Sequence, residues 1–394
     1  MPGPSGKRAG IYEEYFQTGH PGVYREETFG PARQVPFLTG IPAFLGSAPA
    51  ALRRDSVDRI QPVLLSLWSQ FDHQVGRQPG SFLAQAVRGF FENGGHRCYV
   101  VPLEDFSFHS LAAGLEAIES LNTIDLVCAP DLFRNPEAMF ECQQVIVNHC
   151  ETMGDRFAVL DSRLADRREK VWEQWSDIDG KNGAIYYPWI RVPGDEDGFD
   201  LVPPCGHVAG VIARTDRLRG VHKAPANETL EGVLDLECHL TNRDQDEFNR
   251  RRINCIRAFA GRGIRVWGAR TLSGHPEWTY VNVRRLFLTA VRWIAWNMRD
   301  VVFETADSRL WARIERELTT YFTEQFRAGA FQGATPREAF YVKCDAETNP
   351  SELRDSGQVV TEIGLAPTIP YEFVVVRLIH GARGVTISGP VRPA

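Results

Sequence analysis

The chain has 394 residues, of which 43% are hydrophobic and 24% are charged, an ordinary composition for a globular protein with a sizeable buried core. Its formal net charge of −6 argues against nucleic acid as a direct partner. No stretch reaches the roughly 18 uninterrupted apolar residues that a membrane span needs, and the first residues, MPGPSGKRAG, lack the apolar run of a signal peptide. We therefore expect no direct membrane insertion.

The first 35 residues are rich in Gly and Pro and predict no amphipathic helix. Within them, PGVYREET predicts a short strand that follows a Pro-Gly turn and contains Val23, Tyr24, Arg25 and Glu26. A terminal strand of this kind is frayed unless something else holds it. The other end of the chain has a similar pattern, because YEFVVVRLI is a dense run of β-forming residues followed by a Gly-rich tail. Both ends are thus predicted to be strand-like and peripheral.

Predicted helices and strands alternate in the middle of the chain. In SFLAQAVRGFFE, Phe82, Ala86, Val87 and Phe90 lie on one face of a helix. The segments that follow are RCYVVPL (strand), LAAGLEAIESL (helix), IDLVCAPDL (strand), PEAMFECQQVIVNHCETMG (helix), RFAVLDS (strand), DRREKVWEQW (helix) and AIYYPWIRV (strand). This alternation, with continuously apolar strands, indicates a largely parallel sheet covered by helices.

A second unit is predicted from residue 263, where IRVWGARTL has the pattern of a strand. Phe287, Val291, Ile294 and Met298 then lie on one face of a helix. The segment SRLWARIERELTTYFTEQFRAGAF predicts another helix, and AFYVKCD and EFVVVRLI predict two strands. This order of elements is typical of an α+β unit.

The eight cysteines are scattered and contain no C-x-x-C pair, which indicates reduced, buried thiols. Cys142, His149 and Cys150 could be imagined as metal ligands. Cys142 and Cys150 sit on a predicted helix among apolar neighbours, so packing in the core is the favoured interpretation. We expect no metal and no cofactor.

The motifs of several enzyme classes are missing from the sequence. It has no G-x-G-x-x-G between a strand and a helix, no phosphate-binding P-loop, no H-E-x-x-H and no G-x-S-x-G elbow. Asp161 and His207 are the nearest approach to parts of a Ser-His-Asp triad, but Ser273 lacks the setting of a nucleophile. A structural role for Asp161 and His207 is favoured, and we expect that the protein is not an enzyme.

Eight segments spread along nearly the whole chain carry a further indication of function. They are PGVYREE, NGGHRCYVV, AIYYPWI, GHVAGVIARTDRLRGVHKAPANE, GIRVWGARTLS, EWTYVNVRRLF, AFYVKCD and GLAPTIPYEFVVVRL. In content and order they resemble contractile tail sheath proteins of phage tail-like injection systems, of the R-pyocin, antifeeding-prophage and Photorhabdus-virulence-cassette types. One departure is VVFETADSRLW, where such sheaths more often have Pro-Asn after Phe-Glu, so the local turn geometry stays open.

The resemblance implies a fold that is α/β plus α+β. Residues 41–262 would form an outer αβ domain of subtilisin-like topology without a catalytic triad. Residues 263–370 would form a C-terminal α+β assembly domain. Residues 1–40 and 371–394 would be extended N- and C-terminal strand arms.

The function that the resemblance implies is that of a structural subunit. The protein would polymerise with itself as stacked hexameric rings around an inner tube, bounded by baseplate and terminal cap proteins. It would then contract to drive the tube through a target envelope. Assembly would take place in the bacterial cytoplasm, as part of a virion or an injection device. A hydrolase on the subtilisin-like layer and a sheath-like protein that only caps or anchors are the alternatives.

The candidate site residues are therefore assembly residues. In this family the arms add strands to the sheets of neighbouring subunits. The inter-subunit strands would contain Val23, Tyr24, Arg25 and Glu26 at the N-terminus and Phe373, Val374, Val375, Val376 and Arg377 at the C-terminus. An ordinary strand within the same chain is the alternative. Arg284, Arg285 and helix 309–327 are candidates for contact with the inner tube or a neighbouring sheath domain, although solvated or internally paired arginines remain an alternative.

Overall fold

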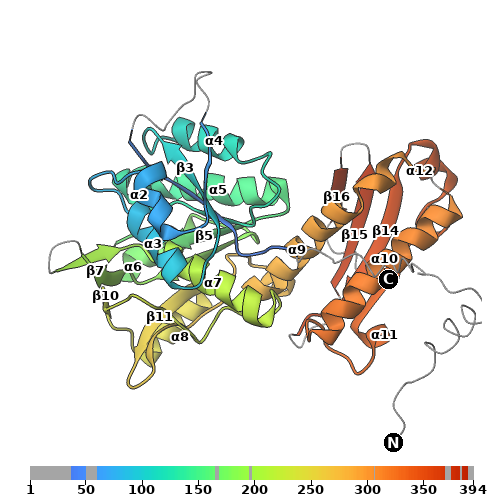
Figure 1. The fold of residues 1–394 in the computed structure, drawn as a ribbon. Helices are drawn as coiled ribbons and strands as arrows, with labels where there is room; N and C mark the ends of the chain where they lie inside the picture. Colours follow the sequence, from blue (N-terminus) through green and yellow to red (C-terminus); the bar gives the residue numbers. More distant parts are fainter. Residues whose placement is uncertain are drawn as a thin grey trace, which may run out of the picture. The chain divides into compact units, whose positions relative to one another are not determined.

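A computed structural model describes residues 37–49, 60–164, 168–194, 198–305, 307–368, 374–381 and 384–388. These residues form a nine-stranded sheet, a three-stranded sheet and a four-stranded sheet, together with the helices that pack on them (Figure 1). The predicted combination of an alternating α/β unit and a C-terminal α+β unit is confirmed at this level.

The nine-stranded sheet has the order β2-β3-β1-β4-β5-β6-β11-β12-β9. Its six strands from β3 to β11 run parallel, whereas β2 at one edge and β12 and β9 at the other pair antiparallel. The largely parallel sheet that the alternation predicts is therefore present. The strands are β1 (Pro42–Ser47), β2 (Val63–Leu65), β3 (Cys98–Leu103), β4 (Leu126–Cys128), β5 (Phe157–Asp161), β6 (Gly183–Tyr187), β9 (Glu228–Thr229), β11 (Ile253–Phe259) and β12 (Gly263–Val266).

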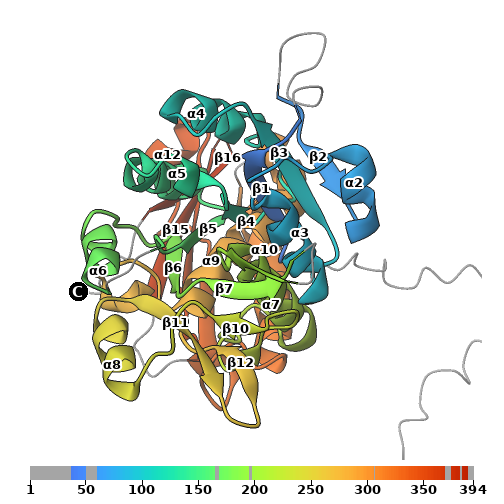
Figure 2. The same cartoon turned by 90° about the vertical axis from the view of Figure 1, so that its left-hand side faces the viewer.

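Helices cover both faces of this sheet (Figure 2). One face carries α3 (Leu83–Glu92) and α7 (Cys205–Arg219). The other carries α4 (Phe108–Ala117), α5 (Met139–Met153), α6 (Arg168–Ser176) and α8 (Asn242–Arg250). Among the described residues of this part there are also three short helices, η2 (Trp68–Gln70), α2 (Phe71–Gln74) and η3 (Leu132–Arg134).

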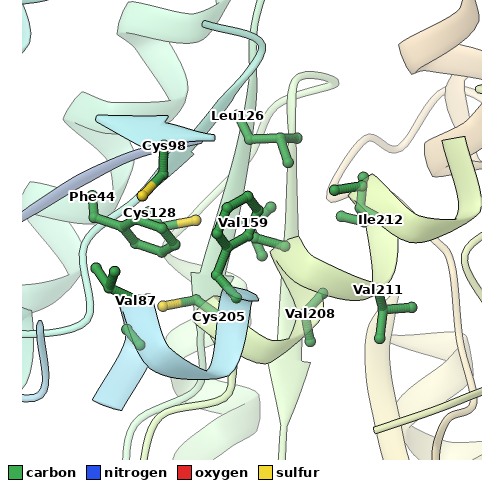
Figure 3. Packing of buried hydrophobic residues seen from close by; sticks show 14 of the residues in the cluster. Phe44, Val87, Cys98, Leu126, Cys128, Val159, Cys205, Val208, Val211 and Ile212 are labelled. Carbon is green, nitrogen blue, oxygen red and sulfur yellow. The ribbon is translucent and has the colours of Figure 1, made fainter. Parts of the chain in front are cut away.

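The alternation of side chains along the strands builds the two cores. In β1, Phe44 joins the core beneath α3 and α7, whereas Ala43 and Leu45 join the core beneath α4 and α5. Figure 3 shows Phe44 packed with Val87 and with residues of the parallel strands. Because both faces are covered, the parallel strands are apolar throughout.

The strand β12 corrects the predicted domain boundary. IRVWGARTL was expected to open the C-terminal unit at residue 263, but β12 pairs antiparallel with both β11 and β9 in the nine-stranded sheet. The hairpin β11–β12 therefore keeps this segment with the α/β unit. A small antiparallel sheet of β10 (Asp235–Leu236), β7 (Ile190–Pro193) and β8 (Phe199–Val202) lies in the same part of the chain.

The C-terminal part begins with η4 (Pro276–Trp278) and α9 (Val281–Asn297). Its antiparallel sheet has the order β13-β14-β15-β16, with strands β13 (Phe340–Lys343), β14 (Val359–Leu365), β15 (Val374–Gly381) and β16 (Gly384–Ser388). The remaining helices are η5 (Arg299–Phe303), α10 (Ser308–Arg327), α11 (Pro336–Ala339) and α12 (Ser351–Asp355).

The third core lies between α9, α10 and the four-stranded sheet. The helix predicted from SRLWARIERELTTYFTEQFRAGAF is present as α10, and its apolar face is buried, with Ile314, Leu318 and Phe322 packed in this core. The α9 residues Phe287 and Ile294 pack in the same core, whereas Leu288 packs in the core beneath α3 and α7. Helix α9 thus contributes side chains to both the α/β core and the C-terminal core.

Candidate functional site

The carboxyl ends of the parallel strands are the place where doubly wound proteins hold their ligands, because the helices there begin with unpaired N–H groups. In this chain the end of β1 and the region after β4 are occupied by Asp131, which is fully buried. Its carboxylate accepts hydrogen bonds from Ser47 N (2.9 Å), Ser81 Oγ (2.6 Å) and Phe82 N (2.5 Å). The side chain therefore joins the end of β1 to the start of α3, which is a structural role.

Asp161 at the end of β5 has a similar role. Its Oδ1 accepts a hydrogen bond from Cys205 N (2.7 Å), at the first residue of α7. Burial raises the pKa of Asp161 to about 7, although the bond from Cys205 opposes that shift. Gln143 and Gln174 both donate to the main-chain oxygen of Asp161, at 2.8 and 3.0 Å. Buried amides and main-chain groups thus fill this end of the sheet.

His207 and Ser273 do not complete a triad with Asp161. His207 lies on α7, where burial lowers its pKa to about 3, and its ring packs against Gly89 of α3. Ser273 Oγ accepts a hydrogen bond from His275 N (3.1 Å). No hydrogen bond joins any two of Asp161, His207 and Ser273 in the part of the chain that the structure describes. The favoured structural reading of Asp161 and His207 fits this geometry.

The cysteines lie as expected from their apolar surroundings. Burial raises the pKa of the Cys98, Cys150 and Cys205 thiols, so they are protonated. His149 contacts Arg156 Nη1 at 3.4 Å, and burial lowers its pKa to about 4. Among the described residues, no group of three or more His, Cys, Asp or Glu side chains could hold a metal ion.

Arg284 and Arg285 are buried, which corrects the prediction that they contact an inner tube or a neighbouring subunit. Arg284 is 5% exposed and Arg285 3% exposed. Arg284 Nε donates to Asn182 Oδ1 (2.6 Å), and its guanidinium lies 4.7 Å from the centre of the Trp278 ring. The alternative of internally paired arginines holds for both. The physical reason is that α9 packs this face on the α/β unit rather than presenting it to solvent.

Arg285 belongs to a buried cluster of charges that the sequence did not reveal. It donates to Asp216 on α7 and to Asp125 just before β4. Arg292 lies on the same helix, two turns after Arg285. Its Nη1 lies 3.8 Å from Asp125 Oδ2, and its Nη2 donates to the main-chain oxygen of Thr123 (3.0 Å). Paired charges of this kind replace the hydration that burial removes.

The same cluster holds the segment that enters β1. Asp125 accepts hydrogen bonds from Gly40 N (3.0 Å) and Ile41 N (2.6 Å). Arg292 Nη2 lies 3.5 Å from the main-chain oxygen of Leu38. Gly40 has φ +72°, and a Cβ there would lie 2.5 Å from the Cα of Ala213, so only glycine fits. The cluster therefore fixes the start of β1 and helix α9 to the same point.

The C-terminal arm residues that the structure describes lie in β15, between β14 and β16 of the same chain. Val374 pairs with Leu365, and Arg377 pairs with Glu362 on one side and Ser388 on the other. The edges of this sheet are β13 and β16. Val23, Tyr24, Arg25, Glu26 and Phe373 lie outside the described residues.

These features define the class of protein. It is an α/β protein with a C-terminal unit of helices and an antiparallel sheet, and structural hydrogen bonds occupy the carboxyl ends of its parallel strands. The model of the phage tail sheath protein central domain matches residues 109–272, and that of the phage tail sheath C-terminal domain matches residues 273–379. Together they cover more than half of the chain, which therefore belongs to the phage tail sheath protein family. The relatives described below are structural proteins, and the chain is no enzyme.

Solved structures of contractile particles are similar over almost the whole chain. The helical sheath of the anti-feeding prophage in its contracted state is 30% identical, with a TM-score of 0.71, over 90% of this chain and 97% of that one. The contracted sheath complex of PVC, an extracellular contractile injection system, is 28% identical, with a TM-score of 0.71, over 90% and 96%. The mixed α/β fold is thus that of sheath structures.

The tail sheath protein of Salmonella phage ViI is 24% identical over 285 residues, which are 69% of this chain and 44% of the relative. The chain spans less than half the length of the curated relatives it matches. No helix in the part of the chain that the structure describes is long and apolar enough to cross a membrane.

Proposed function

We propose that this chain is the sheath subunit of a contractile, phage tail-like particle. The observation that carries the proposal is the 30% identity, over 97% of the matched chain, with the contracted helical sheath of the anti-feeding prophage. The subunit would polymerise as stacked hexameric rings around an inner tube, between a baseplate and a terminal cap. It would assemble in the bacterial cytoplasm, and contraction would drive the tube through a target envelope.

No nucleotide is needed for such a motion if the extended sheath is metastable. The free energy would come from contacts that differ between the extended and contracted arrangements. A difference of about 2–3 kcal/mol per subunit, summed over a hundred or more copies, would amount to hundreds of kcal/mol. Ordinary differences in packing between two subunit arrangements are of this size.

Strand addition by both arms would link the subunits, with residues 1–40 and 371–394 as the arms. The α/β domain between them would have the subtilisin-like topology of the family. An N-terminal strand at Val23–Glu26 could pair with the edge of a neighbour's sheet at β13 or β16, since each edge offers a row of main-chain groups.

At the C-terminus, β15 and β16 could move together onto a neighbour. The antiparallel partner of β15 would still be β14, but from another copy, so the hydrogen bonds of the pairing would be kept. An exchange of identical elements between copies costs little free energy for this reason. The pairing of β15 with β14 within one chain gives the register that an exchanged strand would keep, and this is the support that it lends to the proposal.

The exposed face of α10 remains a candidate for contact with the inner tube. Arg309 and Arg316 are exposed on the face opposite the buried Ile314 and Leu318. A charged face on a rigid helix can bind a partner of complementary charge without a change in its own fold.

Electron microscopy of the expressed full chain tests the proposal. Helical tubes would support the sheath, and a monomer that stays dispersed at high concentration would contradict it. A variant lacking residues 1–30 should stay folded and lose polymerisation; tubes of normal length from this variant would exclude the N-terminal arm as the link. Single capped rings without tubes would favour the alternative of a protein that only caps or anchors.

A further inference from the structure

The hairpin formed by β11 and β12 extends past the strand beside it. β11 pairs with β6 only through Ile253, Asn254 and Cys255. From Ile256 to Phe259 its strand partner among the described residues is β12, at Val266 to Gly263. Figure 2 shows this hairpin in yellow at the lower end of the nine-stranded sheet. Its tip is exposed at Ala260–Gly263.

Three arginines gather on this hairpin, which we name the arginine hairpin: Arg257, Arg262 and Arg265. The guanidinium carbons of Arg257 and Arg262 lie 5.3 and 6.0 Å from the centre of the Phe259 ring. A cation held over an aromatic face keeps its charge and is partly ordered before it meets a partner. Arg262 is exposed, and the other two are half-buried.

The hydrogen-bond partners of these arginines are all neutral. Arg262 Nη2 donates to Asn227 Oδ1 (3.1 Å), and Arg265 Nη1 donates to the main-chain oxygen of Asn227 (2.7 Å). Arg257 Nη2 donates to Asn242 Oδ1 (3.0 Å). None of the three forms an ion pair with a carboxylate among residues that the structure describes. The hairpin thus carries three positive charges that no carboxylate of the described ranges pairs with.

Carboxylates, whose charge is opposite to that of the arginine hairpin, lie along α6 and the turn after it. Glu169 and Glu173 are four residues apart and share one face of α6, whereas Asp177 and Asp179 lie in the turn that follows the helix. All four are exposed and, within the described ranges, none forms an ion pair with Lys or Arg. We call this set the acidic face. The same segment contains the cations Arg168, Lys170 and Lys181, which are fewer than the four carboxylates; Lys170 and Lys181 are half-buried.

We propose that the arginine hairpin of one copy docks on the acidic face of a second copy. The two surfaces have opposite charge, and no ion pair between them is present among the residues that the structure describes. Guanidinium groups bind carboxylates in a planar, two-bond geometry, which gives direction as well as attraction. Because the surfaces differ, the contact is head-to-tail, and repetition produces rings or helices rather than a closed dimer.

This inference rests on the proposed function, since it names residues through which sheath subunits meet one another. It adds a contact between the bodies of the subunits to the links that the arms would supply. The partner is a second copy of this chain because the acidic face is present on every subunit at the same concentration as the hairpin.

A charge-swap experiment on the full-length chain tests it, with tube formation followed by sedimentation and electron microscopy. The variant Arg257→Glu/Arg262→Glu should raise the concentration needed for assembly by about tenfold or more, since like charges then face each other. The matched control is Arg243→Glu/Arg250→Glu on α8, which makes the same change in net charge at two exposed positions. The control should assemble like the wild type. Thermal unfolding of each monomer checks that the variants fold.

The reverse change, Glu173→Arg/Asp177→Arg, should weaken assembly by a similar factor, and all four substitutions in one chain should restore it. The proposal is overturned if the hairpin variant assembles like the control. It is also overturned if the acidic-face variant assembles normally, or if the combined variant assembles no better than either pair alone. Wild-type protein that forms no tubes would instead contradict the proposed function, so the two failures are distinguishable.

Discussion

Arg285 on α9 and Asp216 on α7 form a buried ion pair with two hydrogen bonds, Nη1 to Oδ1 at 2.8 Å and Nη2 to Oδ2 at 2.6 Å. The same Nη2 donates to Asp125 Oδ2 at 2.9 Å. Burial works against the charge on Arg285, but the two carboxylates raise its pKa overall, so the guanidinium stays charged. One side chain of α9 thus binds two elements of the α/β unit.

This pairing would have a mechanical consequence if the terminal arms link the subunits as proposed. Asp125 also accepts the main-chain N–H groups of Gly40 and Ile41, where the chain enters β1. A force on the N-terminal segment would therefore reach α9 through Asp125 and Arg285, without passing through a loop. We expect the start of β1 and helix α9 to move as one body.

Replacing Arg285 by Met should destabilise the monomer by about 3–5 kcal/mol, because the carboxylates of Asp125 and Asp216 would stay buried without their cation. Urea unfolding of the monomer measures this loss. Arg313→Met is the control: its ion pairs with Asp300, Glu304 and Glu317 lie at the surface and are screened by water, so the expected loss is much smaller than that for Arg285→Met. Equal losses for the two variants would show that the buried pair has no special weight.

The crossing of α3 and α7 depends on glycine. A Cβ at Gly206 would lie 2.1 Å from the main-chain oxygen of Ala86. Gly206→Ala should therefore cost about 1–3 kcal/mol net, since backbone atoms cannot move aside and the helix propensity gained is only about 1 kcal/mol. Gly274→Ala is the matched control, because a Cβ there meets only the tip of Arg252 at 3.7 Å. If thermal unfolding finds both variants as stable as the wild type, the crossing is looser than the structure indicates.

The parallel α/β layer could be predicted from the sequence, but one of its interior strands, β1, could not. β1 lies between β3 and β4, and Phe44 and Leu45 are fully buried. Its sequence, PAFLGS, contains Pro42 and Gly46, residues that sequence patterns assign to turns. Strands β3 and β4, which pair with it along their length, decide its conformation, and that information lies far away in the sequence.

The arginines of α9 show the same limit for side chains. A pair of arginines near the start of a helix is compatible with an exposed surface, and the sequence leaves open whether Arg284 and Arg285 contact a partner or are solvated or paired within the chain. The carboxylates that pair with the buried Arg285 lie 69 and 160 residues away in the sequence, at Asp216 and Asp125. Asp125 comes just before the apolar strand LVC, which is weak evidence that its carboxylate is buried and paired. The sequence does not indicate which residue is the partner.

Asp161 should make the stability of the monomer depend on pH. Burial raises its pKa in the folded chain to about 7, well above the value of about 3.9 in an unfolded chain, so its contribution is fully present below pH 4 and is lost as pH rises through 7. Asp161→Asn keeps an oxygen for the Cys205 N–H and does not ionise. The free energy of unfolding of Asp161→Asn, relative to that of the wild type, should therefore be on the order of 2 kcal/mol higher at pH 8 than at pH 5, as measured by urea unfolding. The control is Asp105→Asn, whose exposed carboxyl has its pKa lowered by Ser107, so its effect should be the same at both pH values. If the gain from Asp161→Asn is also the same at both, Asp161 is ionised throughout this range and the bond from Cys205 outweighs burial.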